Sequence, residues 1–294
     1  MALSANPDKI TRDYFDSLLL ETRYMDSSLP STDFSLFGEQ FATPIMTAAL
    51  SHLNNTAPDG MTVYARGAAM AGAVHWVGMG EDEELEAIVA TGAKTIKIIK
   101  PHADNDVVMH KIRHAVDAGC IAVGMDIDHS FNACGGYDNV FGLPMKAKTT
   151  DEIAMFTKAA GVPFIAKGVL SVSDAKKCLD AGCAAIVVSH HHGMMPYSVA
   201  PLMVLPDIIK AVGKEMAVFV DCGIESGLDA YKCLAIGATA VSVGRHLMPL
   251  LKDGAEAVAA RINEMNSELA GVMARTGVAN LDQMDATIIH RRTF

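Results

Sequence analysis

The chain is poor in the features that would suit it to nucleic acid, to a membrane or to a disulfide framework. Its 24 Lys and Arg are outnumbered by 34 Asp and Glu, and the resulting net charge of −10 opposes binding to nucleic acid or to an anionic bilayer. No apolar run approaches the roughly 20 residues that a membrane-spanning helix needs. The six cysteines form no C-x-x-C pair, and the N-terminus lacks the basic and apolar regions of a secretory signal. We therefore expect a reduced, cytoplasmic protein without a zinc site.

Eight short runs rich in Val, Ile and Ala predict buried strands, and segments of helical periodicity such as Asn105–Ala118 separate them. Most of the runs are apolar throughout, which is typical of parallel strands buried on both faces. No G-x-G-x-x-G follows the first run, so a doubly wound sheet is disfavoured, whereas 294 residues suit one barrel. We predict an α/β fold, a (β/α)₈ TIM barrel, with strands at Ala42–Leu50, Ala73–Gly78, Thr95–Lys100, Cys120–Asp128, Pro163–Gly168, Ala184–His190, Met216–Gly223 and Ala240–Gly244.

Two further regions complete the predicted organisation. Residues 1–40 form an N-terminal lead-in with a helical patch at Asp13–Glu21, and residues 41–294 form a single barrel with a C-terminal helical extension. The segment Ser130–Lys148 is a long loop with several glycines after the fourth strand. Such a loop at the catalytic face of a barrel is a candidate lid or substrate contact.

Residues that can carry chemistry follow four consecutive predicted strands, and in a parallel barrel all these strand ends lie on one face. They are Lys167, His191, Asp221 and the pair Gly244-Arg245. The turns Gly223–Gly227 and Ser242–Arg245 predict an anion site, because backbone N–H groups and a helix N-terminus attract phosphate. The carboxylate of Glu225 would oppose this anion if it pointed inward.

Lys167 and the run His190–His192 allow more than one interpretation. Lys167 could be a Schiff-base nucleophile, a partner for an anion or a surface lysine. Strand alternation places His191 opposite to its two neighbours, so three consecutive histidines cannot bind one metal ion, and no metal is predicted. One histidine is better interpreted as an acid or base oriented by Asp126 or Asp128. Lys97, inside an apolar strand, indicates either a functional lysine or an error in the predicted register.

These motifs together resemble the FMN-dependent α-hydroxy-acid oxidase and dehydrogenase family, from about Arg23 to about His290. The similarity is carried by K-G-V at Lys167–Val169, V-S-x-H at Val188–His191 and D-x-G-I-x-x-G at Asp221–Gly227, followed by the Gly-Arg pair. The resemblance implies an FMN cofactor, a small-molecule substrate, no nucleic-acid or membrane partner, and a homo-oligomer, either a tetramer or an octamer.

The resemblance also implies roles for individual residues. His191 would be the catalytic base, Asp128 would orient it, and Lys167 would stabilise the anionic reduced flavin. His129, His192 and Met194 would lie near the substrate. The implied cofactor-binding residues are Ala49, Ser51, Lys97, Asp126, Lys167, Ser189, Asp221, Gly223, Gly244 and Arg245.

The chain departs from the family pattern where the substrate binds. Met194 stands where the family has an arginine that clamps the substrate carboxylate, and methionine cannot form that bidentate contact. Ile99 replaces a tyrosine, Asp126 a threonine, Lys97 a glutamine and Glu225 an arginine. We therefore expect hydride transfer between a hydroxyl-bearing carbon and flavin N5, with a substrate other than a simple 2-hydroxy acid. A flavin-dependent isomerase, a non-catalytic flavin or phosphate-ligand binder, and a flavin-free Schiff-base enzyme are the alternatives.

Overall fold

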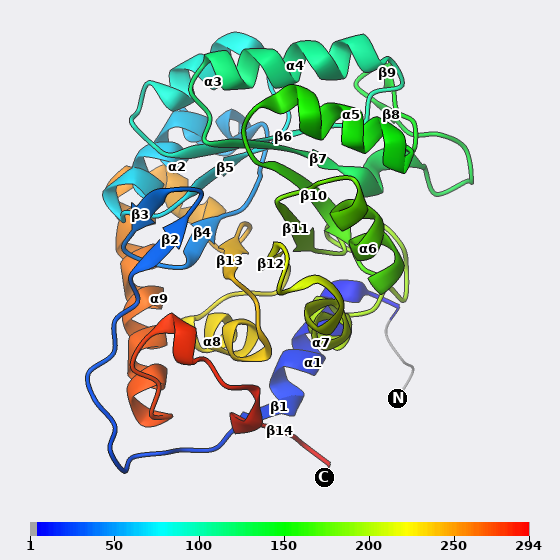
Figure 1. The fold of residues 1–294 in the computed structure, drawn as a ribbon. Helices are drawn as coiled ribbons and strands as arrows, with labels where there is room; N and C mark the ends of the chain where they lie inside the picture. Colours follow the sequence, from blue (N-terminus) through cyan, green and yellow to red (C-terminus); the bar gives the residue numbers. More distant parts are fainter. Residues whose placement is uncertain (1–4, 294) are drawn as a thin grey trace.

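The computed structural model describes residues 5–293, which fold around a barrel of eight parallel strands (Figure 1). The sheet runs in the order β4-β13-β12-β11-β10-β7-β6-β5. Its two outer strands close the barrel, because the Thr47 amide donates to the Val74 carbonyl and the Gly78 amide donates to the Leu50 carbonyl. The predicted TIM barrel is confirmed, with strands β4 (Ile45–Thr47), β5 (His75–Val77), β6 (Thr95–Ile99), β7 (Ala122–Asp126), β10 (Phe164–Val169), β11 (Ala185–Val188), β12 (Ala217–Val220) and β13 (Ala240–Val243).

Helices surround the barrel (Figure 1), and its strands separate two apolar layers of the core. The inner layer lies on the barrel axis, where the rings of Trp76 and Phe219 meet edge to face at 5.6 Å. The outer layer lies between the strands and the helices α2 (Gly60–Met70), α3 (Asp82–Val89), α4 (Asn105–Asp117), α5 (Thr150–Ala160), α6 (Val172–Asp180), α7 (Pro201–Val212), α8 (Gly227–Ile236) and α9 (Ala255–Arg275).

The two layers show which way the side chains of β6 point. Ile96 and Ile98 pack in the inner layer, whereas Ile99 packs in the outer layer. Because side chains alternate along a strand, Lys97 points outward with Ile99. Its ammonium group donates to the Gly78 carbonyl at 2.6 Å and is influenced by charges on α3 and α4. Lys97 therefore does not lie at the mouth of the barrel, and its predicted contact with the cofactor has no support in this geometry.

The lead-in also differs from its predicted form. Helix α1 spans Pro7–Ser17, because the Asn6 side chain caps the Asp8 amide and a proline occupies the first helical position. It ends where β1 (Leu18–Leu20) pairs with β14 (Ile289–Arg291). The helical patch predicted at Asp13–Glu21 therefore begins and ends later than the observed helix.

Short elements fill the remaining connections. A hairpin of β2 (Phe34–Leu36) and β3 (Glu39–Phe41) precedes the barrel. The long loop after β7 opens with the 3₁₀ turn η2 (Ile127–Ser130) and contains the hairpin of β8 (Asn139–Val140) and β9 (Leu143–Pro144). Other 3₁₀ turns are η1 (Leu53–Asn55), η3 (Met248–Asp253), η4 (Leu281–Gln283) and η5 (Ala286–Ile288).

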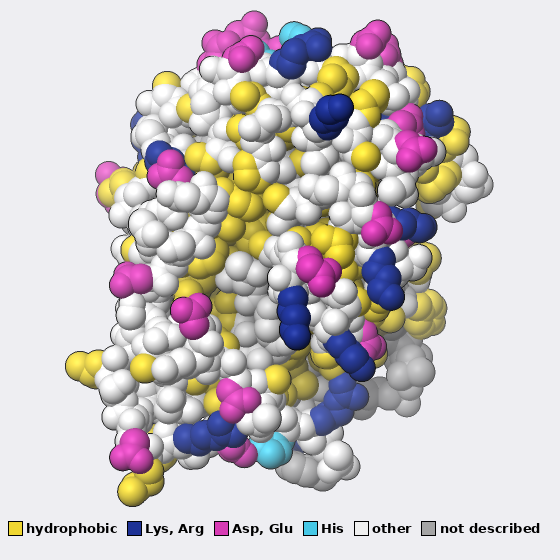
Figure 2. Space-filling model, viewed as in Figure 1, with side chains coloured by type: hydrophobic (Ala, Val, Ile, Leu, Met, Phe, Trp, Pro, Cys, Tyr) yellow, Lys and Arg dark blue, Asp and Glu magenta, His cyan; other side chains and the backbone are white. Residues whose placement is uncertain are grey.

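The surface seen in Figure 2 mixes both signs of charge. Basic and acidic side chains are interspersed on this face, and hydrophobic side chains gather toward its centre. Among the described helices, none combines the length and the apolar content needed to cross a bilayer.

Candidate active site

A cavity of about 540 Å³ lies where the barrel strands end, and it brings together the residues that four separate motifs predicted. Its size lies within the range of roughly 300–1,000 Å³ that is typical of small-molecule sites. Eight of the predicted site residues line it, namely Ala49, Lys167, His191, His192, Asp221, Gly223, Gly244 and Arg245. Asp126, Asp128, His129 and Ser189 lie just behind this lining, in contact with those residues.

His191 and Asp128 form the pair that proton transfer requires. The Nδ1 atom of His191 lies 3.1 Å from Oδ2 and 3.2 Å from Oδ1 of Asp128. The close approach depends on Gly168, whose φ is +93° and whose missing Cβ would lie 2.3 Å from Cγ of Asp128. The K-G-V motif therefore places a lysine in the barrel and leaves room for the carboxylate beside it.

A buried ion-pair network lies next to that pair. Asp126 accepts from Lys167 at 3.0 Å through Oδ1 and from Lys100 at 2.8 Å through Oδ2. All three side chains are at most 9% exposed. Burial acts to raise the pKa of Asp126, but Lys167 and Lys100 outweigh it and hold that pKa well below the ordinary value.

Lys167 is correspondingly held in its charged form. Burial acts to lower the pKa of Lys167, but the carboxylates of Asp126, Asp221 and Asp128 raise it above the ordinary value of a lysine. A Schiff-base nucleophile must be a neutral amine, so this environment disfavours that alternative. It suits a lysine that stabilises an anion.

The sequence missed three residues of the site. Lys100 is the inward lysine of the TIKIIK run, and correct alternation from Ile98 would have identified it. Asp8 and Arg12 line the cavity from α1, which we had assigned to a lead-in without a functional role. Arg12 binds both oxygens of Asp229 and also the Gly223 carbonyl.

The three consecutive histidines do not follow strand alternation, because β11 ends at Val188. His191 and His192 have φ values of +48° and +62°, so the chain turns sharply there. The Ser189 hydroxyl accepts from the His191 amide at 3.1 Å and supports this turn. His190 bonds to Thr11 on α1 at 2.8 Å, which leaves His191 facing Asp128.

Two residues predicted near the site lie outside the cavity lining. The Met194 side chain is 39% exposed beyond the histidine turn. Ser51 lies against Gly78, where an added Cβ would lie 2.4 Å from the serine Oγ. Their predicted roles as a substrate contact and a flavin contact have no support in this geometry.

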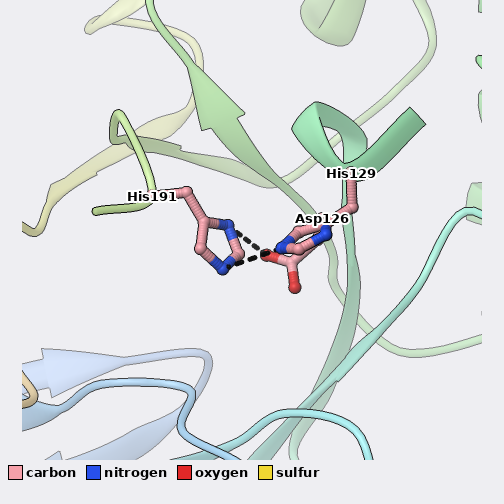
Figure 3. Close-up of side chains that lie close together, drawn as sticks. All are labelled: Asp126, His129 and His191. Atoms are coloured by element: carbon pink, nitrogen blue, oxygen red, sulfur yellow. Dashed lines mark hydrogen bonds and ion pairs between the residues drawn. The ribbon is translucent and has the colours of Figure 1, made fainter. Parts of the chain in front are cut away.

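A cluster that the sequence did not predict lies beside the catalytic pair (Figure 3). Ligand atoms of Asp126, His129 and His191 lie within 4.8 Å of one another. The rings of His129 and His191 meet edge to face, with their Nε2 atoms 3.1 Å apart. Its residues lie at or after the ends of two different strands, and not in one run of consecutive histidines.

The opposite end of the cavity carries the predicted anion site, in altered form. Arg245 points its fork at Asp8, with N···O distances of 2.7 and 2.8 Å, so a carboxylate occupies the arginine that was predicted to bind an anion. The amides of Glu225 and Gly227 already donate to Asp229 and Glu268. The N-terminus of α8 is therefore not free to bind an anion, and the site rests on Arg245 and the neighbouring turns.

This cavity is lined by a charged lysine and an arginine fork and lies beside a histidine–carboxylate pair, and these groups suit a flavin mononucleotide. Barrel and site together define an oxidoreductase of the FMN-binding type. The family model described as FMN-dependent dehydrogenase matches residues 7–150 and 138–291. The chain belongs to this family of FMN-dependent oxidoreductases, and its cofactor is FMN.

Curated relatives and solved structures agree with this assignment. The chain is 30% identical over 285 residues to an L-lactate oxidase of Roseobacter sp. (strain GAI101), covering 85% of this chain and 77% of that protein. It is 26% identical over 317 residues to glycolate oxidase 3 of Arabidopsis thaliana, covering 95% and 86%. A crystal structure of mandelate oxidase with (S)-2-phenylpropionate superposes with a TM-score of 0.88 at 25% identity, covering 98% and 90%.

Proposed function

We propose that the protein transfers a hydride between a hydroxyl-bearing carbon of a small molecule and flavin N5, and that its substrate is not a simple 2-hydroxy acid. The observation that carries this proposal is the retained His191–Asp128 pair, 3.1 Å apart, beside a turn where methionine replaces the carboxylate-clamping arginine. The proton-transfer apparatus is present, whereas the expected clamp is missing.

His191 acts as the base in this proposal. Asp128 accepts a hydrogen bond from Nδ1–H of His191, so this tautomer leaves the lone pair of Nε2 for the substrate hydroxyl. Asp128 also stabilises the imidazolium that forms when the proton is taken. Bound FMN supplies the hydride acceptor.

Lys167 and Arg245 hold the two ends of the cofactor in this proposal. Lys167 is cationic and buried, so it offers a fixed positive charge to the ring that gains electrons. Arg245 offers its fork to the phosphate, after release from Asp8. Asp221, Gly223 and Gly244 line the cavity between them.

The charges around the base favour a polyhydroxy or cationic substrate. Lys100 is engaged by Asp126, so it does not offer a free charge to a substrate carboxylate. Asp128 and Asp138 lie on the His191 and His129 side of the site. A substrate with hydroxyl or ammonium groups would find acceptors here, whereas an added carboxylate would meet like charge.

Replacing the base tests the proposal. The protein purified with FMN should show the flavin absorbance spectrum, and sugar alcohols or amino alcohols should bleach it faster than glycolate, L-lactate or mandelate. His191→Ala should slow this reduction by about 10²- to 10⁴-fold, the usual contribution of a general base. His190→Gln is the matched control, because that neighbouring imidazole binds Thr11 instead.

Each outcome bears on a separate part of the proposal. An unchanged rate in His191→Ala would refute the role of the base. Rapid reduction by L-lactate would refute the proposed substrate class. Turnover that requires prereduced flavin and gives no net redox product would favour the isomerase.

We also propose a cytoplasmic homo-oligomer, either a tetramer or an octamer, as the resemblance implies. Light scattering coupled to size exclusion measures the assembly directly, and a monomer would contradict it.

A further inference from the structure

The imidazole of His191 also meets a second imidazole, that of His129, nitrogen to nitrogen. His129 and His191 meet at 3.1 Å between their Nε2 atoms, with ring centroids 4.3 Å apart (Figure 3). They come from different elements, since His129 lies in η2 after β7 and His191 lies in the turn after β11. The contact is therefore built by the tertiary fold.

The outer nitrogen of each ring faces a carboxylate. Nδ1 of His191 lies 3.1 Å from Asp128, and Nδ1 of His129 lies 3.6 Å from Asp138. Nδ1 of His129 is buried and has no hydrogen-bond partner among the described residues. The Nε2 atoms therefore share one proton in the metal-free protein, and a cation between the two rings would take the place of that proton.

This arrangement of histidine and carboxylate is the one that orients metal-bound imidazoles. A ligating histidine donates its other ring N–H to a carboxylate, which fixes the tautomer and raises the basicity of the ligand. Asp128 is placed for that role on His191, and Asp138 is the carboxylate near the corresponding atom of His129, at 3.6 Å.

Asp126 can supply a third ligand. Its carboxylate lies within 4.8 Å of both histidine ligand atoms. Each of its oxygens already accepts from one lysine, but a carboxylate offers about four lone-pair sites. Two imidazole nitrogens and one carboxylate oxygen are ligands that Zn²⁺ accepts.

The surrounding charge also suits a divalent ion. Asp126, Asp128, Asp138 and Asp221 contribute four carboxylates, and Lys100 and Lys167 contribute two ammonium groups, so the cluster carries a net charge of −2 with neutral histidines. Lys167 is the main opposing group, because its ammonium lies 3.3 Å from Nδ1 of His191. The atom that faces His129 is Nε2, on the other side of that ring.

We propose that His129, His191 and Asp126 form a binding site for a divalent transition-metal ion, with Zn²⁺ as the probe. This metal site is not part of the proposed function, but the two share one atom, Nε2 of His191. Nε2 of His191 cannot bind the ion and take a substrate proton at once. A bound ion is therefore an inhibitor that competes for the base.

Titration of the full FMN-loaded protein with Zn²⁺ tests the site without relying on turnover. Calorimetry should show one tight site per chain, and His129→Ala should weaken it at least tenfold. Asp138→Asn should weaken it less, since it removes only the carboxylate that orients His129. Circular dichroism and the flavin spectrum show whether each variant folds and retains FMN.

A second histidine pair provides the matched control. His110 and His114 stack on α4 and contact Asp82 and Glu86 on α3, so this surface could also attract Zn²⁺. His114→Ala should leave the tight site unchanged. Binding that survives His129→Ala, that is lost in His114→Ala, or that is absent from the wild-type protein would overturn the proposal. Absent flavin reduction with intact Zn²⁺ binding would instead overturn only the proposed reaction.

Discussion

At the residue scale, two lysines three positions apart on the same run have opposite surroundings. Lys100 enters the barrel mouth and pairs with Asp126, whereas Lys97 enters the outer apolar layer and has a backbone carbonyl as its hydrogen-bond acceptor. Burial lowers the pKa of Lys97 to about 8. The charged form of Lys97 is therefore a cost to the folded state.

Lys97→Met should stabilise the protein at neutral pH and lose this advantage in alkali. The unfolded chain holds the Lys97 proton up to pH 10.5, but the folded chain releases it near pH 8. The stability of the wild type therefore rises relative to the variant between these two pH values. The drop in pKa corresponds to roughly 3 kcal/mol, less the hydrogen bond to Gly78. Urea unfolding of both proteins at pH 7, 9 and 10.5 measures this difference in stability.

Lys100→Met is the contrasting variant. It leaves Asp126 with one cation fewer in a buried site, and breaking such a pair costs about 3–5 kcal/mol. If Lys97→Met proved as destabilising as Lys100→Met, the outward assignment of Lys97 would be refuted.

At the element scale, helix α1 is the part of the site that comes from outside the barrel. It carries Asp8 to Arg245, Thr11 to His190 and Arg12 to Asp229. Two of these contacts are bidentate, and they join α1 to the turn after β13 and to the first turn of α8. The helix therefore covers the Arg245 side of the cavity, and Asp8 would compete there with the phosphate of the proposed cofactor site.

Asp8→Ala should raise the affinity for FMN. The carboxylate of Asp8 occupies the fork of Arg245 and repels a phosphate, so its removal frees the cation. A partly exposed ion pair contributes about 0.2–1 kcal/mol, which corresponds to an increase in affinity of up to about fivefold. Fluorescence titration of FMN-depleted protein with FMN measures the change.

Asp13→Ala is the control for that titration, because Asp13 lies on the same helix and pairs only with Lys9 among its described contacts. An unchanged or weakened FMN affinity in Asp8→Ala, with Asp13→Ala unaffected, would show that Asp8 does not compete with the phosphate.

The sequence was sufficient to predict the elements but not how they end. All eight strands were found, because a buried parallel strand is apolar along its whole length. Several strands were predicted to end too late. The segment Ile127–Ser130, for example, begins with an apolar residue that continues the strand pattern, yet it forms a 3₁₀ turn. The start of α1 was missed because its signal is the Asn6-Pro7 cap, whereas the prediction relied on periodicity.

The site was predictable where a strand end fixes it and unpredictable where a turn does. Lys167, Asp221 and Arg245 meet because barrel topology brings strand ends together. The left-handed conformations of His191 and His192 follow from tertiary packing, so strand alternation could not place them. The contact of His129 with His191 depends on that turn and had no sequence signal.

At the scale of the whole molecule, buried neutral histidines should lower the stability of the folded state in acid. Burial lowers the pKa of His75 to about 3 and that of His102 to about 4. The unfolded chain binds protons at these histidines below about pH 6.5, whereas the folded chain does not. The free energy of unfolding should therefore fall as the pH drops from 6.5 to 4, by roughly 3 kcal/mol from His75 alone.

Unfolding measured at pH 7, 5.5 and 4 checks this slope. His75→Gln does not titrate, so its slope should be smaller even if the variant is less stable at pH 7. Paired carboxylates such as Asp126 act in a lower range, because their stabilisation is lost only below about pH 4. A wild-type stability that stays flat down to pH 4 would contradict the prediction.

The pairing of β1 with β14 ties the carboxyl-terminal tail to the far end of helix α1. The Arg292 amide donates to the Ser17 carbonyl at 2.7 Å, and Leu18 lies opposite Arg291. The near end of the same helix holds Arg245 through Asp8. A proteolytic cut or a fused peptide at the tail should therefore disturb the Asp8–Arg245 contact through α1, although no residue of β14 lies in the described cavity lining.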